Sequence, residues 1–135
     1  MAEEYEVRAI PSYTREDTWV RVMPDGTVKI GITDFAQKML NDIVSVQLPN
    51  VGSEVKQMQP LGSAESIKSN SDIYSPVSGK VREINQKVID NPGILNQDPY
   101  DAGWLVAVEP TNLEGELASL LNADAYRALI KEKQG

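Results

Sequence analysis

The chain has 135 residues, of which 41% are hydrophobic, and its 13 basic and 20 acidic residues give a formal net charge of −7. This composition is typical of one ordinary globular domain, and the negative charge argues against binding the phosphate backbone of nucleic acids. Because cysteine and histidine are both absent, the sequence excludes disulfides, thiolate nucleophiles, Cys/His metal sites and a Ser-His-Asp triad.

The N-terminal part of the sequence predicts an irregular lead-in followed by a β-hairpin. Residues 1–12 show no regular pattern. Residues 18–23 and 27–31 alternate between apolar and polar types and are rich in β-formers. Residues 24–26, Pro-Asp-Gly, have the composition of a tight turn, so the two alternating segments are expected to pair as a hairpin.

A short helix is predicted next, over residues 35–40, with an N-cap at Thr33-Asp34. Helical spacing would place Phe35, Met39 and Ala36 on one face. The pattern then returns to period two and predicts a strand, a turn and a brief strand over residues 43–48, 49–53 and 54–56.

The middle of the chain predicts short strands interrupted by small residues. Residues 61–67 and 72–75 are the two arms of a hairpin, and the polar residues 68–71 are the turn between them. Residues 80–85 alternate again and are expected to form a further strand. Residues 90–100 are rich in Asn, Asp, Pro and Gly and are expected to form a loop.

The C-terminal part predicts a last strand over residues 104–108 and then helices after Pro110. Thr111 and Glu114 have the spacing of a capping box for the first helix. Two apolar faces at helical spacing follow, and Asn122 is the expected cap of the second helix. These faces are formed by Leu117, Leu120 and Leu121 and by Tyr126, Leu129 and Ile130. Many short strands with terminal helices predict a small antiparallel β-sandwich with helical additions.

Lys68 is the main candidate functional residue because it lies at the predicted hairpin turn with extended arms on both sides. Its amine should project into solvent. A free lysine has a pKa of about 10.4, so the amine stays charged near neutrality and would serve as an acceptor for an enzyme that acylates amines. Lysines are also common on turns simply for solubility, so the neighbouring sequence has to decide between these interpretations.

The neighbouring sequence resembles the H protein of the glycine cleavage system over nearly the whole chain. The similar segments are residues 31–37 (GITDFAQ), 42–49 (DIVSVQLP), 65–68 (ESIK), 71–79 (SDIYSPVSG), 90–92 (DNP), 96–100 (NQDPY), 103–105 (GWL) and 116–121 (ELASLL). One such segment alone would carry little weight. Their joint order and spacing supports the resemblance.

The resemblance implies a fold that is mainly β with α additions, a lipoyl-type hybrid barrel-sandwich with short helices, including C-terminal helices. It also implies that Lys68 carries a covalent lipoate, one per chain. Glu65 matches a position read by lipoyl-attaching enzymes, although a carboxylate at a strand edge can also be merely solvated. Asp72 matches an acidic residue that lines the cleft for the lipoyl arm. Biotin carriers share the architecture, but their acceptor lysine usually lies between two methionines, not between Ile67 and Ser69.

The function that the resemblance implies is that of a non-catalytic carrier, which shuttles an aminomethyl group and reducing equivalents on a lipoyl-lysine arm. The implied partners are a lipoate-attaching enzyme, glycine decarboxylase, aminomethyltransferase and dihydrolipoamide dehydrogenase. No catalytic residue, metal, nucleic acid or membrane is expected. The N-terminus lacks the features of a secretion signal and no apolar run reaches about 18 residues, so we expect a cytoplasmic protein, one domain over residues 1–135, and a monomer.

The sequence departs from the family at the start of the first long strand. The family usually has His-Glu-Trp there, whereas this chain has Asp17-Thr18-Trp19. Thr18 therefore replaces a glutamate that helps to hold the loaded arm. This departure leaves a second hypothesis open: an H-like lipoate-binding protein that carries sulfur or electrons beside a heterodisulfide-reductase-like complex in sulfur oxidation. A third hypothesis is a scaffold module that has kept the fold and lost the cofactor.

Overall fold

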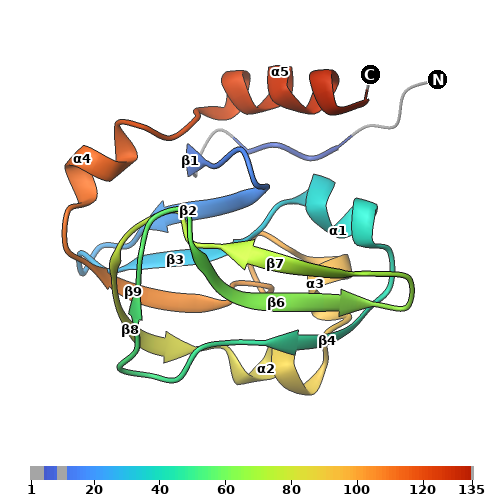
Figure 1. Cartoon of the computed structure of the whole chain (residues 1–135), viewed down its shortest axis with the longest axis horizontal. Helices are drawn as coiled ribbons and strands as arrows, with labels where there is room; N and C mark the ends of the chain where they lie inside the picture. Colours follow the sequence, from blue (N-terminus) through green and yellow to red (C-terminus); the bar gives the residue numbers. More distant parts are fainter. Residues whose placement is uncertain (1–4, 9–11, 135) are drawn as a thin grey trace.

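Two antiparallel β-sheets enclose an apolar core in the computed structural model, which describes residues 5–8 and 12–134 (Figure 1). The larger sheet has the order β1-β2-β3-β9-β8-β5 and the smaller one β4-β6-β7. The six strands of the larger sheet are β1 (Ser12–Tyr13), β2 (Thr18–Val22), β3 (Val28–Ile32), β5 (Glu54–Val55), β8 (Gly79–Ile84) and β9 (Val106–Pro110). The three strands of the smaller sheet are β4 (Ile43–Gln47), β6 (Pro60–Ser66) and β7 (Asn70–Tyr74).

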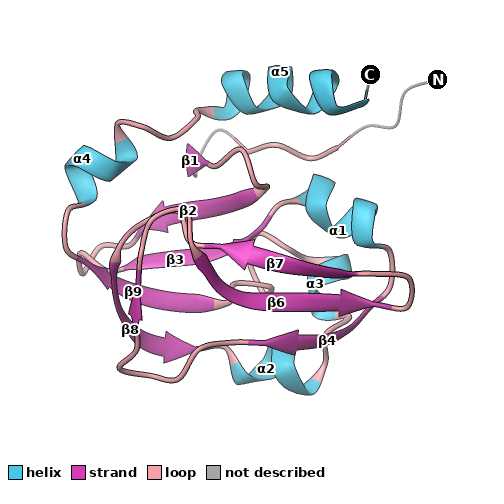
Figure 2. Ribbon diagram, viewed as in Figure 1, coloured by secondary structure: helices cyan, strands magenta, loops and turns pink. Residues whose placement is uncertain are grey.

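Helices lie around the two sheets (Figure 2). They are α1 (Asp34–Leu40), α2 (Gln86–Asp90), α3 (Ile94–Gln97), α4 (Leu113–Leu117) and α5 (Ala123–Gln134). The predicted arrangement, a β-sandwich with helical additions, is confirmed. None of the helices in the described part of the chain has the length and hydropathy needed to cross a membrane.

The predicted first hairpin is formed by β2 and β3, which pair from Thr18↔Ile32 to Val22↔Val28. Gly26 has a φ of 88° in the turn, a conformation that glycine adopts without a steric penalty. The predicted irregular lead-in is only partly described: residues 5–8 are irregular, residues 1–4 and 9–11 lie outside the description, and Ser12 begins β1. Strand β1 forms because Ser12–Tyr13 pairs with β2.

Helix α1 begins as predicted, because the Thr33 hydroxyl accepts a hydrogen bond from the Ala36 N–H. The residues of the predicted apolar face differ in burial. Phe35 is buried, but Met39 is exposed, and the polar side chain of Gln37 is buried in its place. Gln37 tolerates burial because its amide donates to Asp34 Oδ1 and its carbonyl accepts from Asn96.

The loop predicted over residues 90–100 is wrong in part, because α3 lies within it and α2 extends to its first residue, Asp90. Two buried or half-buried asparagines explain these short helices. The Asn85 side chain accepts from the Lys87 N–H and donates to the carbonyls of Ala102 and Trp104. The Asn96 side chain accepts from the Ile43 N–H and donates to Gln37 and the Asn41 carbonyl. The last strand accordingly begins at Val106, two residues later than predicted.

The C-terminal prediction of helices is confirmed, but the cap and the length predicted for α4 are wrong. Asn122 caps α5, since its side chain accepts from the Ala125 N–H at 2.8 Å. The capping box at Thr111 does not form: the N-cap of α4 is Asn112, without a side-chain hydrogen bond. Helix α4 ends at Leu117, so Leu120 and Leu121 do not continue it. Thr111 instead donates through its N–H and its hydroxyl to the Ser78 carbonyl, and the Glu116 carboxylate accepts from the Ser78 N–H and hydroxyl.

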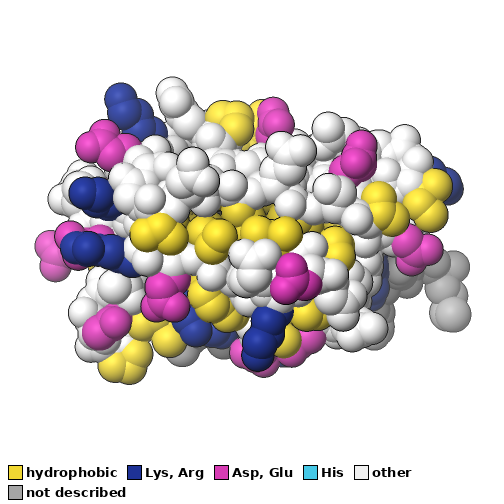
Figure 3. Space-filling view, turned by 90° about the horizontal axis from the view of Figure 1, so that it is seen from below, with side chains coloured by type: hydrophobic (Ala, Val, Ile, Leu, Met, Phe, Trp, Pro, Cys, Tyr) yellow, Lys and Arg dark blue, Asp and Glu magenta, His cyan; other side chains and the backbone are white. Residues whose placement is uncertain are grey.

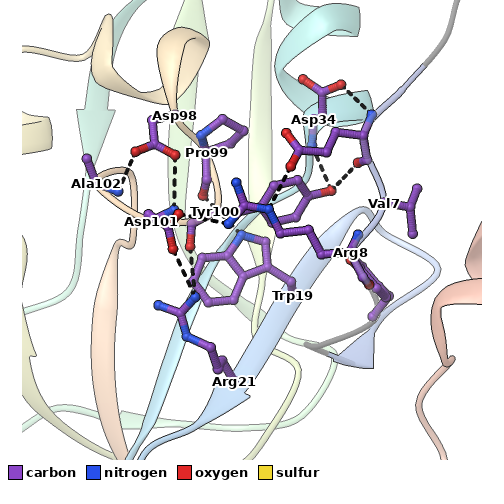
Figure 4. A network of polar contacts seen from close by, with 12 residues as sticks. Val7, Arg8, Trp19, Arg21, Asp34, Asp98, Pro99, Tyr100, Asp101 and Ala102 are labelled. Carbon is purple, nitrogen blue, oxygen red and sulfur yellow. Dashed lines mark hydrogen bonds and ion pairs between the residues drawn. The ribbon is translucent and has the colours of Figure 1, made fainter.

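A second cluster of buried side chains joins the sheet to the two ends of the described chain. This aromatic cluster consists of Tyr13, Trp19, Phe35, Tyr100, Ala123, Tyr126, Leu129 and Ile130. Tyr13 and Tyr126 stack with their ring centroids 4.5 Å apart. The Trp19 indole N–H donates to the Pro99 carbonyl, and the Tyr100 hydroxyl donates to the Glu6 carbonyl (Figure 4).

A polar network lies beside the aromatic cluster (Figure 4). Arg8 bonds Asp101 at 2.8 Å and also lies over the Tyr100 ring. Its hydrogen bond to Asp101 lowers the pKa of that carboxyl group. Arg21 reaches the same carboxylate and the Tyr100 carbonyl. The network therefore ties residues 5–8 to the loop before β9.

Candidate functional site

The predicted lysine hairpin is formed by β6 and β7, which project beyond the body of the molecule at one end (Figure 1). The last residue pair of the ladder is Glu65↔Asn70. The turn was predicted over residues 68–71, but the loop between the strands is residues 67–69. This prediction is corrected because Asn70 is already paired. Lys68 is the central residue of the three-residue loop.

Ser66 closes this loop with both its backbone and its side chain. Its N–H donates to the Ser69 carbonyl at 2.7 Å. Its hydroxyl accepts from the Ser69 N–H at 3.1 Å and lies 3.2 Å from the Ser69 carbonyl, to which it donates. Ser66 is buried, so water does not compete freely for these hydrogen bonds. The loop is therefore fixed at its base while its tip remains open.

The Lys68 side chain is exposed at the tip of the loop. Within residues 5–8 and 12–134 its amine has no hydrogen bond and no ion pair. The preceding residue, Ile67, is 77% exposed. The amine is thus accessible from several directions, and its flexible stem can follow an incoming group. This geometry suits an acceptor of an acyl group better than a structural lysine.

The two other predicted site residues lie on the arms of the hairpin. Glu65 is exposed on β6, three residues before Lys68, and Asp72 is exposed on β7, four residues after it. Of these two carboxylates, only that of Asp72 lines the cleft next to the hairpin. Glu65 does not line that cleft, so the structure separates the two carboxylates.

The cleft beside the hairpin has a volume of about 300 Å³. It lies between β7, the C-terminal half of α1 and the segment that leads into β2. Its wall is formed by Glu16, Asp17, Thr18, Ile32, Ala36, Met39, Leu40, Ala64 and residues 69–73. Apolar side chains from α1 and β3 form one part of this wall, and carboxylates form another. The cleft can therefore receive a flexible chain that is apolar along its length and cationic at its end.

The residues that replace the usual His-Glu pair do not offer a free carboxylate. The Asp17 carboxylate accepts from the Tyr126 hydroxyl at 2.8 Å and from the Lys133 amine at 2.9 Å, so it is engaged with α5. Thr18 is 1% exposed, and its hydroxyl lies 2.7 Å from that of Thr14.

Glu16 is the functional candidate that sequence reasoning missed. It is exposed and lines the same cleft as Asp72. Its position just before Asp17-Thr18 was the available signal, but the sequence alone could not show that Asp17 is engaged with α5 while Glu16 is left exposed beside the cleft. In the described part of the chain, no group of three or more Asp or Glu side chains has the arrangement of a metal site.

The comparisons with known proteins agree on one family. The sequence matches the family model of the glycine cleavage H-protein over residues 11–133. A probable glycine cleavage system H protein of Pyrococcus abyssi is 48% identical over 128 residues, 95% of each chain. The glycine cleavage system H protein of Geobacillus sp. is 48% identical over 120 residues, 89% of this chain and 93% of the relative.

A solved structure agrees with these sequence relatives. The crystal structure of a glycine cleavage system H protein from Mycobacterium marinum matches the fold with a TM-score of 0.80. Its sequence is 40% identical to this chain. The match covers 88% of this chain and 97% of that one. Fold and sequence therefore point to the same family.

Proposed function

The chain belongs to the glycine cleavage H-protein family, and from that premise we propose that Lys68 is the residue that carries the lipoyl group. The family consists of non-catalytic lipoyl carriers that act in glycine cleavage, with lipoate attached to a lysine. The fold is accordingly the lipoyl-type barrel-sandwich predicted from the sequence. The relatives are named for glycine cleavage, so the alternative of a sulfur-oxidation carrier is not favoured.

The observation that carries the proposal is the accessible, unpartnered amine at the tip of the closed loop. Attachment forms an amide bond between Lys68 Nζ and the carbonyl carbon of an activated lipoyl group. The activating group leaves with its electron pair, and the ammonium nitrogen loses two of its three protons to solvent and keeps one as the amide N–H. One positive charge disappears, which takes the formal net charge from −7 to −8. When bound, the lipoyl group supplies a strained disulfide that carries an aminomethyl group and reducing equivalents.

We also propose that Asp72 and Glu16 hold the cationic end of the loaded arm in the cleft. An aminomethyl group ends in a primary amine that is protonated near neutrality. A carboxylate attracts this cation, and the attraction is stronger in a partly enclosed cleft than in open water. Because Thr18 replaces the family glutamate, Glu16 supplies the second carboxylate in this chain. Glu65 remains outside the cleft, in a position that suits recognition by a lipoate-attaching enzyme.

The chain interacts with the enzymes of glycine cleavage as a member of this family. We propose that these partners are glycine decarboxylase, aminomethyltransferase and dihydrolipoamide dehydrogenase, after a lipoate-attaching enzyme has modified Lys68. A carrier that visits several active sites in turn benefits from small size and free diffusion. We therefore propose a single-domain monomer that works in the cytoplasm.

The test is a glycine–bicarbonate exchange assay with lipoylated protein and glycine decarboxylase. We expect exchange with the wild-type chain and with Lys80→Arg, a control at another exposed lysine. We expect none with Lys68→Arg, because arginine is not an acceptor for amide formation. Asp72→Asn and Glu16→Gln should each lower the exchange rate severalfold without preventing lipoylation. Absence of exchange with the lipoylated wild type, together with its reduction by a heterodisulfide-reductase-like complex, would overturn the glycine-cleavage role.

A further inference from the structure

Exposed apolar side chains gather around the lysine hairpin. Six large hydrophobic side chains are exposed in the described part of the chain. Three of them lie beside the hairpin: Met39, Val44 and Ile67, which are 53%, 52% and 77% exposed. We call these three residues the hairpin collar. Isolated exposed hydrophobic residues need no explanation, but a group of them around the one modified residue does.

The backbone brings the collar to Lys68 from three different elements. Ile67 directly precedes Lys68. Val44 lies at an irregularity of the β4–β6 ladder, where Ile43 pairs with Ser66 and Ser45 pairs with Glu65. Val44 is therefore an extra residue of β4 that has no partner on β6. It lies beside the base of the loop, and its side chain is directed away from the core.

Met39 approaches the hairpin from the other side. It projects from α1 into the wall of the cleft, which also includes Ser69 and Asn70. Figure 3 shows that hydrophobic side chains reach the surface in a band along the face seen from below, with carboxylates and some basic side chains among them.

Carboxylates make up most of the exposed charge around the collar; Lys38, next to Met39, is only partly exposed and is ion-paired with Asp34. Asp42, Glu65 and Asp72 are exposed in the segments that carry the collar and the hairpin. Residues 57–79 contain no other lysine or arginine than Lys68. Any protein that surrounds Lys68 must therefore meet apolar side chains next to the lysine and carboxylates around them.

We propose that the hairpin collar is the docking surface for the lipoate-attaching enzyme, whose active-site mouth is apolar and carries lysine or arginine at its rim. An enzyme that transfers a lipoyl group has to bury an eight-carbon apolar chain, so the pocket for this chain is apolar. Lys68 has to enter that pocket, and the collar then closes its mouth against water. Basic residues at the rim would meet Asp42, Glu65 and Asp72.

This inference rests on the proposed function, because it assumes that Lys68 is the acceptor. It extends that function by naming the residues that recruit the enzyme and the chemistry of the surface that they contact. The reason for recruitment is physical: desolvation of the collar contributes binding free energy that a lysine on a merely solvated turn would lack.

The experiment measures initial rates of lipoylation of the full chain by a lipoate ligase with lipoate and ATP, followed by intact mass. The test variants are Val44→Thr, Ile67→Thr and their double variant. The matched controls are Val22→Thr and Val51→Thr, which change side chains that are similarly exposed elsewhere, at 48% and 59%. Threonine keeps the branching at Cβ and the β-propensity, so all variants should fold, which circular dichroism checks.

We expect the double variant to raise KM roughly five- to twentyfold with little change in kcat, and the controls to stay within about twofold of the wild type. The KM of the wild type should also rise with salt concentration, and Asp42→Asn should reduce that salt dependence. Equal KM values for test and control variants would overturn the collar proposal alone. Absence of modification of the wild type would overturn the proposed function and the collar proposal together.

Discussion

The lysine hairpin and the aromatic cluster are built in opposite ways. The tip of the hairpin is exposed and is held by a two-strand ladder and the Ser66 hydrogen bonds. The aromatic cluster is buried and joins residues that are up to about 120 positions apart, through ring stacking and hydrogen bonds of Tyr126 with Thr33 and Asp17. The first region leaves the Lys68 amine exposed, and the second holds the two ends of the described chain against the sheet.

This difference implies that substitutions in the two regions should affect different quantities: the rate of lipoylation for the hairpin and the free energy of unfolding for the aromatic cluster. Changes at the hairpin tip remove few buried contacts, so they should affect modification and leave the free energy of unfolding almost unchanged. Changes in the aromatic cluster remove buried area and hydrogen bonds, so they should affect stability and leave Lys68 available. Each prediction below tests this separation.

The largest effect is expected for Tyr126→Ala. Tyr126 is fully buried, stacks on Tyr13 and bonds Thr33 at 2.6 Å, so its removal leaves a cavity and unpartnered polar groups. We expect the free energy of unfolding to fall by about 3–5 kcal/mol in urea denaturation. Lys68→Ala is the matched control, and its unfolding curve should coincide with that of the wild type. A loss of similar size in both variants would contradict the separation.

Alkaline pH should weaken the aromatic cluster selectively. Burial raises the pKa of Tyr13, Tyr100 and Tyr126, whereas a tyrosine in the unfolded chain ionises near pH 10. The folded state retains these protons after the unfolded state has released them. The stabilisation is therefore fully present below about pH 10 and is lost as pH rises further, at roughly 1.4 kcal/mol per pH unit for each such tyrosine.

Tyrosinate absorbance and far-UV circular dichroism, recorded together, check this expectation. The absorbance of the buried tyrosines should rise only where the secondary-structure signal is lost. Complete ionisation of all five tyrosines in a chain that keeps its native signal would be incompatible with the buried cluster described above.

For Ser66→Ala we expect a smaller loss of stability than for Tyr126→Ala, but a clear decrease in the lipoylation of Lys68. The variant loses the hydroxyl that bonds Ser69 and closes the loop. We expect a stability loss of about 1 kcal/mol and a severalfold lower kcat/KM for lipoylation. Ser66→Thr keeps the hydroxyl and should restore the rate. If Ser66→Ala were lipoylated at the wild-type rate, the closed loop would not be needed to present the lysine.

The sequence predicted those elements whose cause is local. The hairpin β2–β3 follows from alternation and a glycine turn, and the caps at Thr33 and Asn122 follow from a single side chain bonding the backbone three residues away. The exposed position of Lys68 was predicted for the same reason, because a polar turn between two extended arms is visible in a short window.

The elements that were missed depend on contacts between distant segments. Helices α2 and α3 form where Asn85 and Asn96 bond residues far along the chain, and Thr111 bonds the Ser78 carbonyl in place of the predicted capping box. The exposure of Met39 could not be predicted, because helical spacing does not show which side of a short helix meets a cleft. Glu16 escaped notice because the cleft exists only once its own segment and β7 are brought together.

The most direct test of the central claim is the intact mass of the protein purified from its native source, with peptide mapping of the modified site. We predict the mass of the bare polypeptide plus one lipoyl group, located at Lys68, and no added mass in a Lys68→Arg chain expressed in the same cells. A native chain with the bare polypeptide mass, or a lipoyl group on another lysine, would contradict the account.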